Sequence, residues 1–223
     1  ANQSNYIPWK GYFDIIRMAD LFIFYDDVQY TYRDWRNRNL IKTPHGLKWL
    51  TIPCGKRTEQ LICEVNIKEH PWQKKHWTSI KMNYSRSRYF NRYRPFFEEI
   101  FLGREWRSLS ELNQYIIKRI CREILQCDTK FEDSRKYKLK RNKEGRIIEL
   151  LQHVGASEYL CGPAAKSYLK AKSLNHLGIK LEWMDYRGYP EYRQLFPPFQ
   201  HRVSIIDLIF NEGPNASKYM KQL

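Results

Sequence analysis

Two adjacent carboxylates follow a short apolar run near the start of the chain. The run Leu21-Phe-Ile-Phe-Tyr25 is typical of a strand buried on both faces, and Asp26 and Asp27 come directly after it. Ligands of open α/β sheets bind outside the carboxyl ends of the strands, so these carboxylates are candidates for a magnesium ligand, a hydroxyl clamp or a general base. Neighbouring side chains face opposite ways, so at most one should reach a given ligand. Capping of a helix or turn is the alternative.

A basic segment follows the predicted ligand end of this strand. Arg33-Asp-Trp-Arg-Asn-Arg-Asn39 places three arginines and two asparagines within seven residues. Arginine offers a planar fork for phosphate, and asparagine supplies both a donor and an acceptor for a sugar or base edge. Trp35 could pack under a sugar ring or a base. The segment predicts a phosphate-binding site, and a solvated basic turn is the alternative. The candidate residues are Arg33, Arg36, Asn37, Arg38 and Asn39.

Two predicted helix starts are further candidates for anion binding. The opening segment carries Asn5, Tyr6 and Lys10 just before a helical pattern, and Ser204 and Asp207 stand at the start of another near the C-terminus. Free backbone N–H groups at a helix start bind anions. Ser204 and Asp207 would share one helix face, although Asp207 could equally complete a Ser204 cap.

His201 is the one histidine that we select for acid–base work. It follows two prolines that hold the approaching chain extended. We expect Asp27, Asn37 and His201 to line one cleft, with capping roles far apart as the alternative. Gly162 follows a short apolar run and precedes a helical pattern, which predicts a tight turn on the ligand side of the sheet. A purely structural turn is the alternative.

Composition points to an anionic partner. The 223 residues carry 39 Lys and Arg against 24 Asp and Glu, a formal charge of +15 and a pI near 9.6. Nucleotides, nucleotide-sugars, nucleic acid or an acidic membrane surface would suit this charge, and a solvated surface with no dedicated partner is the alternative. The range 68–107 interleaves aromatic and basic residues, which suits nucleic acid, although an aromatic core on basic helices explains it as well.

The sequence predicts a protein of the cytoplasm. Aromatic residues make up 15% of the chain, which excludes a wholly disordered protein. No apolar run of 18 residues and no signal-peptide pattern occurs. The five cysteines fit no zinc spacing, so we interpret them as reduced thiols.

Apolar patterns predict an α/β fold with a parallel sheet. Strands are expected at 21–25, 49–52, 62–67, 159–161 and 180–184, with helices between them at both ends of the chain. The pattern is helical from about 71 to 125, with a capping box at Ser108-Leu-Ser-Glu111. We therefore expect an α/β core of residues 1–70 and 143–223, with 71–142 as a helical insertion or lid.

Six segments together resemble the WbqC-like protein family, in order and over nearly the whole chain. The resemblance implies a cytoplasmic bacterial protein. Members of the family often lie in gene clusters for O-antigen (lipopolysaccharide) and other surface polysaccharides. Ser4 stands where the family has proline. The segments are Asn5-Tyr-Ile-Pro-Trp-Lys-Gly-Tyr-Phe13, Phe24-Tyr-Asp-Asp-Val-Gln-Tyr30, Arg33-Asp-Trp-Arg-Asn-Arg-Asn39, Trp49-Leu-Thr-Ile-Pro53, Tyr159-Leu-Cys-Gly-Pro163 and Ser204-Ile-Ile-Asp-Leu-Ile-Phe-Asn-Glu-Gly213.

A second resemblance is to the first βαβ unit of nucleotidylyltransferases. A Pro-x-x-Gly loop, a helix, an apolar strand and an acidic end follow one another in that order. The resemblance implies a nucleotidylyltransferase-like parallel sheet with a helical insertion lobe. The two histidines of the family's adenylation motif are absent, because Pro8-Trp-Lys-Gly11 stands in their place.

Three hypotheses follow for the function. The first is a transferase that tailors a nucleotide-activated sugar by acyl or aminoacyl transfer to an amino sugar. Arg33, Arg36 and Arg38 would hold the diphosphate, and Asp27 or His201 would take the proton of the attacking amine. The second is nucleotidyl transfer with magnesium at Asp26 and Asp27 and a nucleoside triphosphate. The third is a non-catalytic nucleic-acid-binding or assembly protein. The sequence leaves the oligomeric state open.

Overall fold

The chain is a mixed α/β protein whose parallel strands occur in short pairs. The computed structural model describes residues 1–69 and 71–221. Strand β1 (Leu21–Phe24) pairs in parallel with β4 (Lys130–Asp133), and β5 (Glu158–Cys161) pairs in parallel with β6 (Lys180–Trp183). The expected strands at 21–25, 159–161 and 180–184 are confirmed. Residues 70, 222 and 223, at the edges of the predicted core, lie outside the described residues.

An antiparallel hairpin forms a third sheet. Strand β2 (Arg38–Thr43) runs against β3 (Gly46–Thr51), with Arg38 opposite Thr51 and Thr43 opposite Gly46. Gly46 has a φ of +102°, which suits the tight turn after Pro44 and His45. The last two residues of the basic segment, Arg38 and Asn39, therefore lie in a strand.

The expected strand at 62–67 is wrong. Residues Ile62–Glu64 form a 3₁₀ turn, and the Glu64 carboxylate accepts a hydrogen bond from the Leu61 amide at 2.9 Å. Ile62 and Val65, three apart, are both buried. The apolar residues therefore face the core through a turn rather than through the alternation of a strand.

Seven α-helices cover these strands in the described part of the chain. Ser108 caps α4 by accepting a hydrogen bond from the Glu111 amide, as the capping box predicted. A π-helical turn, Ile120–Ile124, continues α4. The helices are α1 (Lys10–Arg17), α2 (Trp72–Tyr84), α3 (Phe90–Leu102), α4 (Leu109–Arg119), α5 (Lys143–His153), α6 (Ala171–Asn175) and α7 (Ile205–Glu212). Further 3₁₀ segments are Ser134–Tyr137, Pro163–Ser167 and Gly213–Tyr219.

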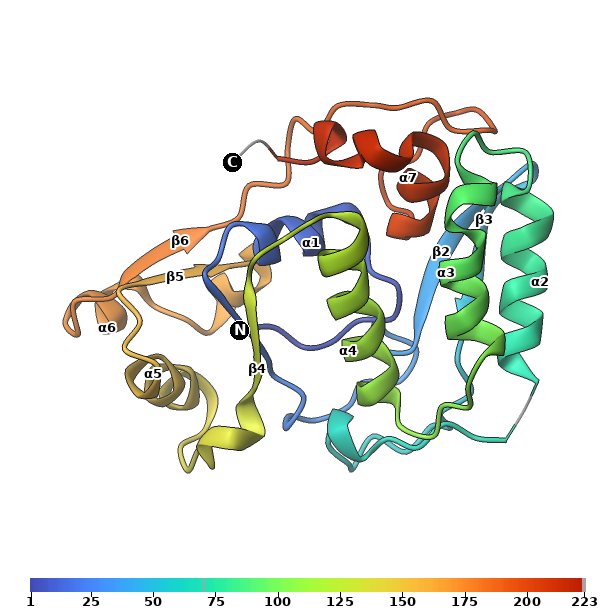
Figure 1. Ribbon diagram of the computed structural model, residues 1–223. Helices are drawn as coiled ribbons and strands as arrows, with labels where there is room; N and C mark the ends of the chain where they lie inside the picture. The colour runs from blue at the N-terminus through green and yellow to red at the C-terminus, as the bar shows by residue number, and fades with distance from the viewer. Residues whose placement is uncertain (70, 222–223) are drawn as a thin grey trace.

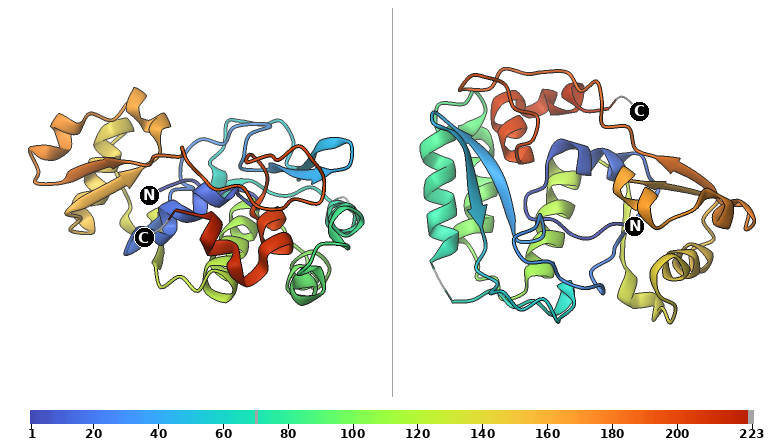
Figure 2. Two further views of the ribbon diagram at one scale, coloured as in Figure 1. Left: turned by 90° about the horizontal axis from the view of Figure 1, so that it is seen from above. Right: turned by 180° about the vertical axis from the view of Figure 1, so that it is seen from behind.

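The main core joins distant parts of the sequence. One buried cluster contains side chains from the opening loop, α1, β1, α2, α3, α4 and α7, and a second lies around α5, β5 and α6. Figure 2 shows these two groups of elements on opposite sides of the molecule. The 71–142 insertion stays a prediction. Within that range α2–α4 come first and β4 then pairs with β1. No helix of the described residues has the length and apolar character needed to cross a bilayer.

A long tail without regular secondary structure links β6 to α7. It passes above α1 in Figure 1, and the Lys10 ammonium of α1 donates a hydrogen bond to the Pro190 carbonyl of the tail at 3.1 Å. The tail thereby brings residues near 190 and 200 to the N-terminal loop.

Candidate functional site

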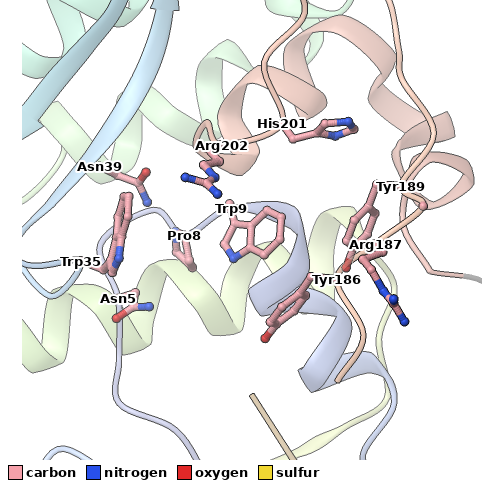
Figure 3. Close-up of a pocket in the computed structure, with 11 residues that line it drawn as sticks. Asn5, Pro8, Trp9, Trp35, Asn39, Tyr186, Arg187, Tyr189, His201 and Arg202 are labelled. Atoms are coloured by element: carbon pink, nitrogen blue, oxygen red, sulfur yellow. The ribbon is translucent and has the colours of Figure 1, made fainter. Parts of the chain in front are cut away.

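A cavity lies between the opening loop, the start of β2 and the tail. It has a volume of about 690 Å³, and aromatic side chains supply much of its lining. Figure 3 shows Trp9 between two groups of these residues: Asn5, Trp35 and Asn39 on one side, and Tyr189 and His201 on the other. The lining residues are Asn5, Pro8, Trp9, Trp35, Asn39, Tyr186, Arg187, Gly188, Tyr189, His201 and Arg202.

Asn39 holds the opening loop in its shape. Its side-chain amide donates hydrogen bonds of 3.0 Å to the carbonyls of Tyr6 and Ile7. The Tyr6 amide in turn donates to the Trp35 carbonyl at 2.9 Å. Ile7 has a φ of +36°, a left-handed conformation that β-branched residues rarely adopt. The hydrogen bonds from Asn39 therefore stabilise a strained loop that forms one wall of the cavity.

The Trp9 ring lies directly over the first turn of α1. A Cβ atom at Gly11 would come within 2.4 Å of the Trp9 ring. Only glycine lets the indole pack this closely. The ring then packs against Tyr186 at a centroid distance of 5.1 Å and against Tyr189 at 5.7 Å. The position of the Trp9 ring in the cavity lining therefore depends on Gly11.

Buried carboxylates fix the tail. The Tyr189 hydroxyl donates to Asp14 at 2.6 Å, and the Tyr192 hydroxyl donates to Asp207 at 2.7 Å. Burial raises the pKa of both carboxyl groups. These contacts hold the wall that carries Tyr189 against α1 and α7.

Two polar atoms at the cavity have no hydrogen-bond partner among the described residues. Asn5 Oδ1 and His201 Nδ1 are both buried and accept or donate no hydrogen bond in the structure. A buried polar atom without a partner lowers the stability of the fold unless a ligand or water forms a hydrogen bond with it. Burial, reinforced by the nearby Lys10 charge, lowers the His201 pKa below its usual value. The imidazole is therefore neutral at pH 7, as a general base requires.

A cation also faces the cavity. The Arg202 guanidinium points toward the space between Asn39 and Trp9, whereas that of Arg187 points away from it (Figure 3). Arg187 instead pairs with Asp185 at 2.9 Å on the exposed surface. Arg202 is thus the side chain best placed to meet an anion in this cavity.

A smaller cavity adjoins the first. It has a volume of about 310 Å³ and shares Asn5, Trp9, Trp35 and Tyr186 with the larger one. Its far end is the turn after β5, which is mostly apolar. The residues at that end include Tyr159, Cys161, Gly162, Pro163, Ala164, Ala165 and Tyr168.

Four of the residues selected from the sequence therefore line the two cavities. Asn5, Asn39 and His201 line the larger one, and Gly162 lines the smaller one. Asn39 shapes the cavity by positioning the opening loop. Its side-chain NH₂ donates to the two loop carbonyls, and its side-chain oxygen accepts from the Leu40 amide, so these groups are already paired within the protein.

Asp26 and Asp27 line neither cavity. Asp26 is fully buried and accepts hydrogen bonds from the Ser4 amide at 2.7 Å and from the Ser110 hydroxyl, and burial raises its pKa. Asp27 turns the other way and pairs with Arg146. The opposite directions are those expected of neighbours at a strand end. The shared cleft of Asp27 and Asn37 with His201 is not formed at this cavity.

Several side chains of the basic segment contact other protein groups, although Arg36 Nε, Asn37 Oδ1 and Arg38 Nε are buried without a hydrogen-bond partner among the described residues. Arg36 bonds to Gln3 and to Asp34, and the Asn37 amide donates to the Ile52 carbonyl at 2.9 Å. Arg38 stacks its guanidinium over Trp49, 4.1 Å from the ring centroid. Arg33 is exposed beside Tyr32. Phosphate binding by this segment stays a prediction.

The start of α7 is occupied by protein groups, and the candidate side chains near the start of α1 contact other side chains. The Ser204 amide donates to the Leu40 carbonyl and the Ile205 amide to the Pro8 carbonyl, each at 2.8 Å, so these N–H groups do not face an anion. Asp207 is buried and also accepts from the Tyr84 hydroxyl at 2.9 Å. Tyr6 bonds to His76, and Lys10 lies between the rings of Tyr189 and Tyr192.

Sequence reasoning did not select several lining residues. Tyr186 and Arg202 lie in the irregular tail, where no periodicity marks an orientation. The density of aromatic residues from 183 to 199 was the available signal. Among the described residues, no group of three or more His, Cys, Asp or Glu side chains is placed to hold a metal ion.

The comparisons agree with the resemblance noted in the sequence. The model of the WbqC-like protein family matches residues 3–219. The uncharacterized protein Rv1507c of Mycobacterium tuberculosis (strain ATCC 25618 / H37Rv) is 43% identical over 221 residues, which cover 98% of this chain and 95% of that protein. No solved structure matches the chain.

Proposed function

This chain belongs to the WbqC-like protein family, and we propose that it is a transferase that tailors a nucleotide-activated amino sugar. The reaction would be acyl or aminoacyl transfer in the synthesis of bacterial surface polysaccharides such as O-antigen, in the cytoplasm. The observation that carries the proposal is the aromatic cavity with an unpartnered amide oxygen, a neutral imidazole and an arginine around it.

The cavity suits a ligand with rings and a phosphate. Trp9 and Trp35 offer faces for a base or a sugar ring. Asn5 Oδ1 would accept a hydrogen bond from a hydroxyl or amino group. Arg202 would hold the diphosphate through charge-assisted hydrogen bonds. This assignment moves the phosphate contact from the 33–39 segment to the tail.

His201 is the proposed general base. As the amine of the sugar attacks the acyl carbon, a new C–N bond forms and the bond from that carbon to the leaving group of an activated donor breaks. The imidazole takes the proton that the amine loses and returns it to the departing group. Its lowered pKa keeps it unprotonated at neutral pH.

The smaller cavity would take the acyl group. Pro163, Ala164 and Ala165 give its far end an apolar lining, and its near end shares Trp9 and Trp35 with the sugar site. An acyl chain there would lie beside a sugar bound in the larger cavity. A nucleotidylyltransferase-like relation of the fold is part of the proposal, supported by the parallel β1–β4 and β5–β6 pairs.

Titration calorimetry with a panel of nucleotide-sugars, nucleoside diphosphates and free sugars tests the proposal. Arg202→Ala should weaken binding of a nucleotide-sugar about 10- to 100-fold, since a charge-assisted bond contributes roughly 1.5–3 kcal/mol. Arg193→Ala removes an exposed arginine of the same tail that lines neither cavity, and it should leave the affinity unchanged.

His201→Ala separates binding from chemistry. It should retain nucleotide-sugar binding and lose transfer, and the wild-type rate should rise with pH to a plateau reached below neutrality. Absence of binding across the whole panel, or equal loss in the Arg202 and Arg193 variants, would reject the proposal.

A further inference from the structure

Two shallow grooves flank Met82 on the face built by β3, α2 and α3, at the right of Figure 1. One groove lies between β3 and α2, and the other lies between α2 and α3. Both are lined by Lys74, Thr78 and Met82. None of the residues that line the grooves also lines the aromatic cavity. The face adjoins the proposed active site, because Trp49 of the first groove packs against Trp35 of the cavity at a centroid distance of 5.5 Å.

Large apolar side chains are exposed on this face. Met82 is 77% exposed and Leu102 is 54% exposed, while Leu47 and Trp49 are each 41% exposed. Met82 and Trp49 line the first groove, and Met82 and Leu102 line the second. Exposed apolar side chains that gather along one surface are typical of an interaction site.

The same face is positively charged. Lys48, Lys74 and Lys81 are exposed and line the grooves, and no ion pair of the described residues uses them. Glu98 is the one acidic lining residue, and Arg94 pairs with it at 2.9 Å. The grooves therefore combine an unneutralised positive charge with apolar surface.

We propose that this face binds the surface of an anionic phospholipid bilayer. Lysine ammonium groups would lie at the level of the acidic headgroups, and Met82 and Leu102 would enter the boundary with the acyl chains. This combination of basic and apolar side chains is characteristic of proteins that lie on a membrane without spanning it.

The orientation of the aromatic residues favours a membrane over a nucleic acid. Trp72, Trp77 and Tyr84 of α2 are at most 4% exposed, so they cannot stack on bases. The Arg38 guanidinium stacks on the Trp49 ring, 4.1 Å from its centroid, and Trp35 also packs against that ring at a centroid distance of 5.5 Å. Exposed methionine and leucine side chains also contribute little to binding a sugar-phosphate backbone, whereas they are suited to lipid.

Vesicle co-sedimentation of the full chain tests this inference. The protein should bind vesicles with about one third phosphatidylglycerol in phosphatidylcholine and should not bind pure phosphatidylcholine. Each lysine near an anionic surface contributes about a fivefold factor in affinity. The triple variant Lys48→Glu, Lys74→Glu, Lys81→Glu should therefore bind at least about 100-fold more weakly.

A matched variant separates this face from the overall charge. Lys140→Glu, Lys170→Glu, Lys172→Glu replaces three exposed lysines elsewhere, so both variants change the net charge by the same amount. The control should bind within a fewfold of wild type. Met82→Ser with Leu102→Ser should weaken binding while keeping the preference for anionic lipid.

Three outcomes overturn the inference. They are absence of binding to anionic vesicles, an equal loss in the two triple variants, and binding of single-stranded RNA that depends on the three lysines while vesicles do not bind. All variants lie on the surface and should keep the wild-type circular dichroism spectrum and melting temperature.

Discussion

Gly11→Ala should damage the ligand site while leaving the fold intact. The new methyl group would lie 2.4 Å from the Trp9 ring, and ordinary carbon contacts begin at about 3.4 Å. The indole must therefore shift by roughly 1 Å or turn toward the cavity. The shift disturbs its packing on Tyr186 and Tyr189, each contact contributing about 0.5–1.5 kcal/mol. Alanine in place of glycine gains up to about 1 kcal/mol of helix propensity, so the net change in stability should stay small.

Ligand affinity should respond more than stability does. A stacked ring contributes about 1–3 kcal/mol per aromatic contact, so displacement of Trp9 should weaken nucleotide-sugar binding about 5- to 100-fold. Calorimetry and thermal melting measure the two effects on the same samples. Gly145→Ala is the matched control, because its new Cβ would meet only the Arg141 side chain, at 3.4 Å, within a helix of the same chain.

A double-mutant cycle identifies the cause. In a Trp9→Ala background Gly11→Ala should have no further effect on affinity, because the ring that it displaces is gone. Unchanged affinity in Gly11→Ala alone would refute the reasoning, as would an effect that persists without Trp9. The first result would mean that Trp9 does not contact the ligand.

Three further changes test how the site is positioned. Asn39→Ala leaves two loop carbonyls unpaired and should lower the free energy of unfolding by about 2–5 kcal/mol in denaturant melts, whereas a loss under 1 kcal/mol would contradict its role. Tyr189→Phe should cost about 1–3 kcal/mol and loosen the tail, which protection of tail amides from hydrogen exchange would report; unchanged protection would contradict this. Burial lowers the Lys10 pKa to about 8, below about 10.4 in the unfolded chain. Since the unfolded chain then binds more protons between these values, stability relative to Lys10→Met should rise by about 1–3 kcal/mol from pH 8 to 10.5, and a flat or falling difference would refute it.

Local patterns predicted many elements of the fold. The apolar runs of β1, β5 and β6 and the cap at Ser108 depend on neighbours in the sequence, so composition and spacing were sufficient. The strand predicted at 62–67 was wrong for a physical reason. Ile62 and Val65 point inward from a 3₁₀ turn, whose period of three is hard to distinguish from alternation in six residues.

The cavity depends on contacts that no local pattern encodes. Asn5 and His201 were selected by type and position, but Tyr186 and Tyr189 belong to a tail without periodicity. Ser204 illustrates the limit most clearly. It is the helix cap that the sequence predicts, yet its own amide donates to a strand carbonyl from 164 residues earlier in the chain, at Leu40. A helix start can bind an anion only if its amide groups are not already hydrogen-bonded to a distant part of the chain, and the local sequence does not show this.

The tail is held by a buried polar network rather than by regular structure. Lys10 lies near Asp14 and Asp207, and the two carboxylates accept hydrogen bonds from Tyr189 and Tyr192. The positive charge of the ammonium stabilises the negative charge of the two carboxylates, which would otherwise be costly to bury. Each member of such a network is expensive to leave unpaired, so the network fixes one arrangement of the tail. Because Tyr189 also lines the cavity, the interactions that stabilise the tail are those that shape the ligand site, and substitutions in this network should change binding and stability together.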